Sequence, residues 1–517
     1  MMKKVLSTIF LAGTLMLSSC DMDLSQPGTI TLGKSMQTAD DVLGFRNNVY
    51  SQLRALCSGS YVTNVELQSD FFIGLRGNGG RGSTMSQGTF TPSTSAISSC
   101  YGGSYGAIGT INYILEKGTD LLGSGTLSAD EEAEVNRYLA ECRFMRAYIY
   151  YWLFDHYCQA YTPDKANTPA LGLQLMTTFN PSATPAEYPG RSTMAETIKL
   201  INDDLTAAYD GLLEWEGIDA SQCAPNAYYL SSYAVAALQA RVALLTQDYA
   251  TAISKAQHVI DSSIFALCQG QDYIAMWSND EGSELIFVPF VDANEAGSVG
   301  SFFDAYNYVS NFPTRVDYVP TYEVVSSYSS KDVRGNAFFA GLEMTVDAQP
   351  TAAYIFNKFP GNVALIQGRT NNYKNKPKPF RLSELYLILA EAAQSSTQEP
   401  VANQALNTLR KARISGYKDA TYSGTLLRDE IRRERAKELI GEGFRISDLR
   451  RWGLGFKRDN SYENLGSGYT PLPNLFISSD VSVVYQANDY RYTWPIPADE
   501  FDVNKQITGQ QNPGYDN

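Results

Sequence analysis

The chain has 517 residues, a formal net charge of −14 and a sequence pI of about 4.8. This acidic balance argues against a nucleic-acid partner and against a polybasic membrane-surface module, because both depend on basic patches. Hydrophobic residues make up 44% of the chain, so it is not disordered by composition and is long enough to bury a large core.

The first residues carry the pattern of a bacterial lipoprotein signal. Two lysines precede an apolar stretch at 5–17, which is too short to span a membrane but suits the hydrophobic part of a signal peptide. Small residues then lead to Cys20. We therefore expect residues 1–19 to be a signal peptide, Cys20 to be lipidated and residues 20–33 to form a tether. The alternative is an ordinary secretory signal with an incidental cysteine.

Six cysteines remain after Cys20. They would allow three disulfides in an exported protein, with fifteen possible connectivities. No C-x-x-C pattern occurs, and the apolar helical surroundings of Cys142 and Cys158 favour buried free thiols. The six are Cys57, Cys100, Cys142, Cys158, Cys223 and Cys268.

Apolar periodicity predicts a mainly α-helical chain. In residues 38–56, for example, Val42, Phe45, Val49 and Leu53 recur at three and four residues. Helix pairs of this size resemble tetratricopeptide repeats, although no clean 34-residue period can be read. A short apolar run at 285–291 predicts an isolated strand. The predicted helices are 38–56, 105–122, 129–157, 193–213, 227–245, 249–262, 386–394 and 401–413.

Long irregular segments separate these helices, at 74–104, 162–191, 292–318 and 453–490. Loops of this length in a compact domain are usually functional or disordered. They are rich in Gly, Ser, Asn, Tyr and Phe and carry little charge. This composition suits a surface for a neutral, hydroxyl-rich ligand, so we expect a helical scaffold that presents long loops.

The run IRRERAKELIGEGFRISDLRRWG, residues 431–453, begins as a charged helix. Acidic and basic residues lie three or four apart, as in Asp429–Arg433, Glu430–Arg433 and Glu434–Lys437, so opposite charges are expected to meet on one face. Two glycines at 441 and 443 then break the helical pattern.

A second charged cluster follows the two glycines and ends at Trp452. Its members are costly to bury beside an indole unless they pair with each other. They are Arg445, Asp448, Arg450 and Arg451.

Catalytic motifs are scarce. The only histidines, His156 and His258, both lie in helical patterns, and neither a G-x-S-x-G elbow nor a glycosidase-like stretch is present. The glycine-rich residues 74–82 lack the G-K-[ST] ending of a phosphate loop. No calcium-loop pattern is evident. We therefore predict a non-enzymatic protein without a cofactor or a set of metal ligands, while the acidic loops leave calcium binding open.

The order E-G-x-R-x-x-D-L-R-R-W within residues 442–452 resembles the signature of the SusD/RagB family of bacterial outer-membrane nutrient-binding lipoproteins. Residues 492–515 are similar to the family's ending, and residues 380–393 and 404–413 resemble its paired helices. Phe444 and Ile446 depart from the residues expected around Arg445, which changes the packing there.

The resemblance implies a SusD-like helical scaffold at the cell surface, beside a SusC-like TonB-dependent transporter in the outer membrane. It implies capture of oligosaccharides, or of peptides in some members, without chemistry. We favour a glycan-binding protein over two alternatives, a peptide-binding member and a scaffold that binds only the transporter. One domain, 34–517, is expected, with a helical part at 34–265, a loop-rich ligand face at 266–379 and the signature part at 380–517.

The resemblance places the ligand site in two loops, residues 61–105 and 292–318. We add the loop before residue 380, because an Arg–Asp pair across loops would bind a hydroxylated ligand. The alternative for each candidate is a packed loop aromatic or a structural ion pair. We predict ligand contacts by Asp70, Arg81, Tyr101, Phe302, Tyr306, Tyr308, Arg369 and Tyr373. Trp277, Trp452 and Trp494 are expected to be structural, and Trp215 is left undecided.

Overall fold

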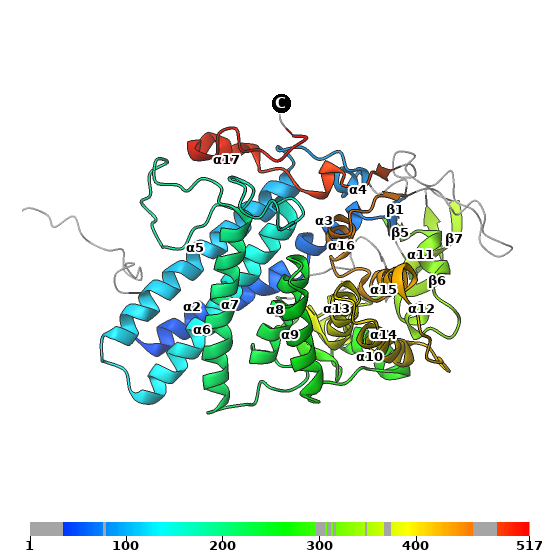
Figure 1. Ribbon diagram of the computed structural model, residues 1–517, viewed down its shortest axis with the longest axis horizontal. Helices are drawn as coiled ribbons and strands as arrows, with labels where there is room; N and C mark the ends of the chain where they lie inside the picture. Colours follow the sequence, from blue (N-terminus) through cyan, green and yellow to red (C-terminus); the bar gives the residue numbers. More distant parts are fainter. Residues whose placement is uncertain are drawn as a thin grey trace, which may run out of the picture.

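The computed structural model describes residues 35–75, 79–295, 306–307, 312–313, 317–346, 349–366, 374–458 and 483–515. The predicted mainly α-helical fold is confirmed: long helices gather on one side, and shorter helices and strands lie on the other (Figure 1). The expected signal peptide, the lipidated Cys20 and the tether lie outside the described residues. Within the described ranges, no helix is both long and apolar enough to cross a membrane.

The helices agree closely with the sequence periodicity. Residues 129–157, for instance, form α6 (Ala129–Tyr157), which begins with a capping box between Ser128 and Glu131. In chain order the longer helices are α2 (Ala39–Leu56), α3 (Ser60–Gln68), α5 (Ser95–Gly123), α6, α7 (Met194–Glu216), α8 (Ser232–Leu245), α9 (Tyr249–Asp261), α10 (Gly270–Asn279), α13 (Leu382–Ser395), α14 (Glu399–Arg413) and α15 (Gly424–Leu439). Shorter helices are α4 (Ser83–Gln87), α11 (Tyr322–Ser326), α12 (Val333–Phe338), α16 (Arg445–Arg451) and α17 (Ala498–Val503).

One expected loop is partly wrong. Residues 74–104 were predicted to be irregular, but α4 lies within them and α5 begins at Ser95. Ile97, Cys100 and Ile108 are all buried at helical spacing, so an apolar face runs from the start of α5. The small and polar residues between them conceal this face in the sequence.

Small residues let the helices approach closely. A Cβ built on Gly211 of α7 would lie 2.8 Å from the Cβ of Ala140 on α6, so only glycine fits there. The alanines of α8, including Ala236 and Ala240, are buried because α8 lies between other helices. Helix α13 packs against α8, α9, α14 and α15 and joins the two ends of the helical array.

The strands are short and, among the described residues, form five separate two-stranded antiparallel sheets. The expected strand at 285–291 is the shorter β2, which pairs with β8 just before α13. The pairs are β1 (Phe72–Gly74) with β5 (Tyr318–Pro320), β2 (Leu285–Phe287) with β8 (Phe380–Arg381), β3 (Tyr306–Asn307) with β4 (Phe312–Pro313), β6 (Phe339–Val346) with β7 (Gln349–Phe356), and β9 (Phe456–Lys457) with β10 (Val484–Tyr485).

The predicted break after α15 is confirmed. Gly441 has φ +82°, and a Cβ there would lie 2.6 Å from Cζ of Phe356. Only glycine combines this backbone conformation with so close a neighbour. The chain then turns into α16, which carries the second charged cluster of the signature.

The charges of α15 pair differently from the local prediction. Glu430 and Arg433 form the expected pair at 3.1 Å. The expected Glu434–Lys437 pair is wrong, because the side chain of Glu434 is 2% exposed and bonds inward to Arg410 at 2.6 Å. Lys437 instead contacts Asp332 at 3.1 Å.

A buried ion network joins the signature to the rest of the core. Glu438 of α15 accepts hydrogen bonds from Arg334, Arg381 and Arg413 at 3.0–3.1 Å. Arg381 and Arg413 also bond Glu284, beside β2. Burial disfavours the charge on Glu438, but the three guanidinium groups hold its pKa well below the ordinary value. The network therefore fixes β2, α12, α14 and α15 relative to one another.

The second cluster of the signature is also fully paired. Asp448 accepts from Arg435 at 3.0 Å and from Arg451 at 2.7 Å. Arg450 bonds Asp155 of α6 at 2.5 Å, and Arg445 bonds Asp70. Within the cluster only Arg451 and Asp448 pair with each other, as expected. The acidic partners of Arg445 and Arg450 lie elsewhere in the chain, because α16 packs against α3 and α6.

The tryptophans expected to be structural are confirmed as such. Trp277 and Trp494 are each 1% exposed, and the indole of Trp494 donates to Gln68 at 2.8 Å. The indole of Trp452 donates to Glu391 at 2.7 Å. Trp215, at the end of α7, lies under the guanidinium group of Arg137 at 4.7 Å. The six cysteines described are all free thiols, as expected.

Candidate functional site

The two loops predicted to hold the ligand site meet at the β1–β5 sheet. Phe72 pairs with Pro320, and the backbone N–H of Leu75 donates to the Asp317 carbonyl at 2.9 Å (Figure 1). Both strands are fully buried. Segments far apart in the sequence thus form one surface beside α3, α11 and α16.

An arginine–aspartate pair spans the two loops at this sheet. The guanidinium group of Arg81 lies 2.5 Å from the Asp317 carboxylate, and the Tyr318 hydroxyl donates to the Arg81 carbonyl at 2.7 Å. The Arg81 side chain is 45% exposed, whereas that of Asp317 is 1% exposed. Asp317 therefore holds the guanidinium group in place, although the Arg81 side chain remains partly exposed to solvent.

Asp70 is positioned at the junction between α3 and β1. The neighbouring Ser69 carbonyl accepts from the buried Arg458 at 3.0 Å, and the Ser69 hydroxyl accepts from the Phe71 N–H at 3.1 Å. The Asp70 carboxylate then accepts two parallel hydrogen bonds from Arg445, at 2.8 and 2.7 Å. Burial opposes the charge of Arg445, but Asp70 outweighs it and raises the pKa of the guanidinium group.

The Asp70–Arg445 pair lies at one side of a groove of about 590 Å³, which we call the charged groove. Its other walls come from α11, the end of α14 and the outer face of α15. Arg410 and Arg433 in this groove both bond Glu430, at 2.7 and 3.1 Å. Because its charges are largely matched, the groove offers hydrogen-bonding groups without a strong net field.

The predicted site residues are only partly brought together. Asp70 precedes β1 in the chain and Arg81 follows it, and contact of either residue with a ligand remains a prediction. The prediction that Tyr101 contacts a ligand is wrong. Tyr101 lies in α5 and is 1% exposed, and its hydroxyl donates a hydrogen bond to Gln174. Its ring packs against Tyr105 and Tyr157 because α5 starts earlier than predicted.

The other candidates remain predictions. Tyr306 belongs to β3 and pairs with Pro313, and only its backbone is described. Phe302, Tyr308, Arg369 and Tyr373 lie outside the described residues.

Asp317 and Arg445 are the residues that sequence reasoning missed. Asp317 follows the long second loop and carries no local pattern. The sequence predicts that Arg445 pairs within its own cluster, whereas its partner Asp70 lies 375 residues away in the chain.

The described residues contain no group of three or more His, Cys, Asp or Glu side chains able to hold a metal ion. His156 is buried, and burial lowers its pKa, which favours the neutral ring inside α6. Its Nδ1 lies 2.7 Å from the Trp152 carbonyl. The arrangement at β1–β5 thus provides fixed donors and acceptors suited to binding.

The fold and this surface define a helical binding protein in which short strands bring long loops together. A family model described as "SusD family" matches residues 320–515, and one described as "Starch-binding associating with outer membrane" matches residues 78–244. The chain belongs to the SusD/RagB family.

Relatives extend along nearly the whole chain. A SusD-like protein of Formosa agariphila is 24% identical over 99% of this chain and 100% of its own length. A SusD superfamily structure from Bacteroides thetaiotaomicron has a TM-score of 0.73 at 24% identity, covering 92% of this chain and 100% of that one. A putative sugar-binding protein from Bacteroides vulgatus has a TM-score of 0.69 at 22% identity, covering 93% and 100%.

Proposed function

We propose that this protein is a cell-surface lipoprotein that captures oligosaccharides and delivers them to a SusC-like TonB-dependent transporter. Membership in a family with a starch-binding, outer-membrane-associated branch supports glycan capture. The sugar-binding description of the Bacteroides vulgatus structure points the same way. Ligand is bound and released unchanged, without a cofactor.

The observation that carries the proposal is the partly exposed Arg81 side chain, paired with the buried Asp317 where the two loops meet. A guanidinium group with a fixed orientation presents several N–H donors in one plane, and these can donate to neighbouring hydroxyls of a sugar. Asp317 neutralises the charge of Arg81. A neutral glycan can therefore bind beside Arg81 without supplying a negative charge. The nearby charged groove offers further polar contacts for a longer chain.

Affinity electrophoresis of a soluble form, residues 21–517, against neutral and acidic polysaccharides tests this function. We expect one polysaccharide to retard the protein, and Arg81→Ala to reduce that retardation with the circular dichroism spectrum unchanged. Arg428→Ala is a matched control, because Arg428 is also partly exposed (43%) and also pairs with an aspartate, Asp429. Retardation by no glycan, with binding of peptide mixtures instead, would reject glycan capture.

The membrane anchor and the partner need their own tests. We expect Cys20→Ala to abolish labelling by radioactive palmitate and to release the protein from the outer membrane. Protease accessibility on intact cells tests outward orientation. Co-purification of a TonB-dependent transporter with the lipidated protein tests the partner, and a transporter complex unaffected by any glycan would favour a purely scaffolding role.

A further inference from the structure

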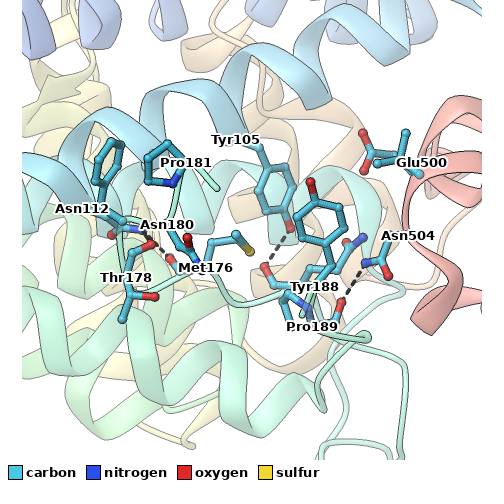
Figure 2. Close-up of a pocket in the computed structure, with 14 residues that line it drawn as sticks. Tyr105, Asn112, Met176, Thr178, Asn180, Pro181, Tyr188, Pro189, Glu500 and Asn504 are labelled. Atoms are coloured by element: carbon cyan, nitrogen blue, oxygen red, sulfur yellow. Dashed lines mark hydrogen bonds between the residues drawn. The ribbon is translucent and has the colours of Figure 1, made fainter. Parts of the chain in front are cut away.

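A second cavity lies between α5, the segment 174–189 and α17. Its volume is about 360 Å³. Figure 2 shows Tyr105 from α5 and Tyr188 from the segment side by side, with Glu500 of α17 across from them. Pockets for small molecules span about 300–1,000 Å³, so this one suits a small ligand.

The walls of this cavity are fixed by hydrogen bonds. Arg191 donates to the Gly172 carbonyl at 2.9 Å and to the Gln510 carbonyl at 2.8 Å, which ties the segment to the C-terminal tail. The Asn504 amide donates to the Pro189 carbonyl at 2.8 Å (Figure 2). The pocket is therefore preformed, and a ligand would not have to order it.

Several polar side chains of the lining hold its walls together. Tyr105 donates to the Gln174 carbonyl at 3.0 Å, and the Asn112 amide donates to the Met176 carbonyl at 2.9 Å (Figure 2). In contrast, the Glu500 carboxylate and the Tyr188 hydroxyl have no hydrogen-bond or ion-pair partner among the described residues. Burial, and then the neighbouring Asp499, raises the pKa of Glu500.

The side chains that line the cavity restrict the chemical class of ligand that it can bind. It contains no lysine or arginine, so a phosphate, sulfate or carboxylate would meet Glu500 without a compensating cation. The rings of Tyr105, Phe179 and Tyr188 provide apolar faces that stack on the C–H faces of sugars. Glu500 and the Tyr188 hydroxyl then supply an acceptor and a donor at the edge of these faces.

We propose that this cavity is a second glycan site that binds one or two neutral pyranose rings, with a sugar hydroxyl donating to Glu500 and a ring face against Tyr188. The ligand class rests on the proposed function, but the site is separate from β1–β5. Two sites on one molecule would hold a long glycan at two points and raise its effective affinity.

Gly109 of α5 allows the cavity to be closed without disturbing the fold. It lines the pocket, and a Cβ built on it meets no atom within 4 Å. A leucine there would occupy the space of the ligand and would also favour the helix. Gly44→Leu on α2 is a matched control, because Gly44 is likewise helical with nothing within 4 Å of its Cβ, but lies outside the pocket.

Saturation-transfer-difference NMR of the soluble form with methyl glycosides of glucose, galactose, mannose and xylose tests the site. We expect binding of at least one glycoside, lost in Gly109→Leu and retained in Gly44→Leu. Glu500→Gln should weaken it about tenfold, because the bond loses its charge but keeps an acceptor. Asp502→Asn, an exposed carboxylate on the same helix, should leave it unchanged.

Two outcomes overturn the proposal. One is the absence of glycoside binding to the wild-type protein, or binding that survives Gly109→Leu. The other is a preference for methylammonium over glycosides with an affinity that falls steeply with salt, which would make this a cation site. The experiment distinguishes failure of this proposal from failure of the proposed function. If Gly109→Leu abolishes glycoside binding but no polysaccharide retards the protein, the pocket is supported and polysaccharide capture is rejected.

Discussion

Arg445 and Asp70 lie 375 residues apart and form two parallel hydrogen bonds, at 2.8 and 2.7 Å, between the start of α16 and the junction before β1. The pair links the family signature directly to the surface where the two predicted ligand loops meet. Arg445 also lies over the ring of Phe71 at 5.0 Å, so its position is set by packing as well as charge. The signature therefore holds Asp70 in place at this surface.

Removal of this pair should destabilise the protein moderately. Arg445→Ala leaves a carboxylate that is only 20% exposed without its partner, and charged hydrogen bonds contribute about 1.5–3 kcal/mol. We expect the free energy of unfolding to fall by about 2 kcal/mol in urea titrations. Arg433→Ala is the control, since that side chain is 62% exposed and its pair should contribute less than about 1 kcal/mol. Equal losses in the two variants would contradict a structural role for the Asp70 pair.

Glu66 should make stability depend on pH. Burial raises its pKa to about 7 from 4.5, although its carboxylate accepts from the Gly443 N–H at 2.6 Å. The folded state therefore holds a proton that the unfolded state releases above pH 4.5, so stability falls as pH rises from 4.5 to 7 and is constant above.

The variant Glu66→Gln keeps an acceptor for Gly443 and does not titrate. We expect its loss of unfolding free energy between pH 4.5 and 8 to be smaller than that of the wild type by up to about 3 kcal/mol. Urea titrations at several pH values measure this difference. Glu214→Gln, an exposed carboxylate on α7, should follow the wild-type curve. Parallel curves for wild type and Glu66→Gln would show that Glu66 does not retain its proton.

The turn between α15 and α16 should tolerate no side chain at Gly441. An alanine would meet both a positive φ and the ring of Phe356, at 2.6 Å. We expect Gly441→Ala to lower the free energy of unfolding by about 2–4 kcal/mol, the sum of backbone strain and overpacking, as measured in urea titrations. Gly416→Ala separates the two effects, because Gly416 has φ +71° with nothing within 4 Å of its Cβ. It should cost only about 1–2 kcal/mol, and a similar cost at Gly441 would rule out the steric contribution.

The six cysteines should titrate as thiols. The soluble form contains six, all free. Ellman's reagent should report six thiols in denaturant and fewer in the native protein, because Cys100, Cys142, Cys158 and Cys268 are buried. The midpoint of thermal unfolding should not change on reduction. A drop in that midpoint with dithiothreitol would reveal a disulfide and contradict the structure.

Local patterns in the chain were sufficient to predict most of the helices. The 3.6-residue periodicity places α6 at residues 129–157, and the two glycines place the break after α15. The need for buried charges to pair was also readable from the sequence. These features depend on residues that are near one another in the chain, so a single sequence is enough to predict them.

Only the tertiary structure decided which side chains contact each other. Glu434 bonds Arg410 on another helix and not Lys437 one turn away, and Tyr101 is buried although its segment is rich in glycine and serine. Arg81 meets Asp317, and Glu500 faces Tyr188, only because distant segments fold together. Periodicity shows which face of an element is buried, but long-range packing selects the neighbour that covers it, and a site is made by such neighbours.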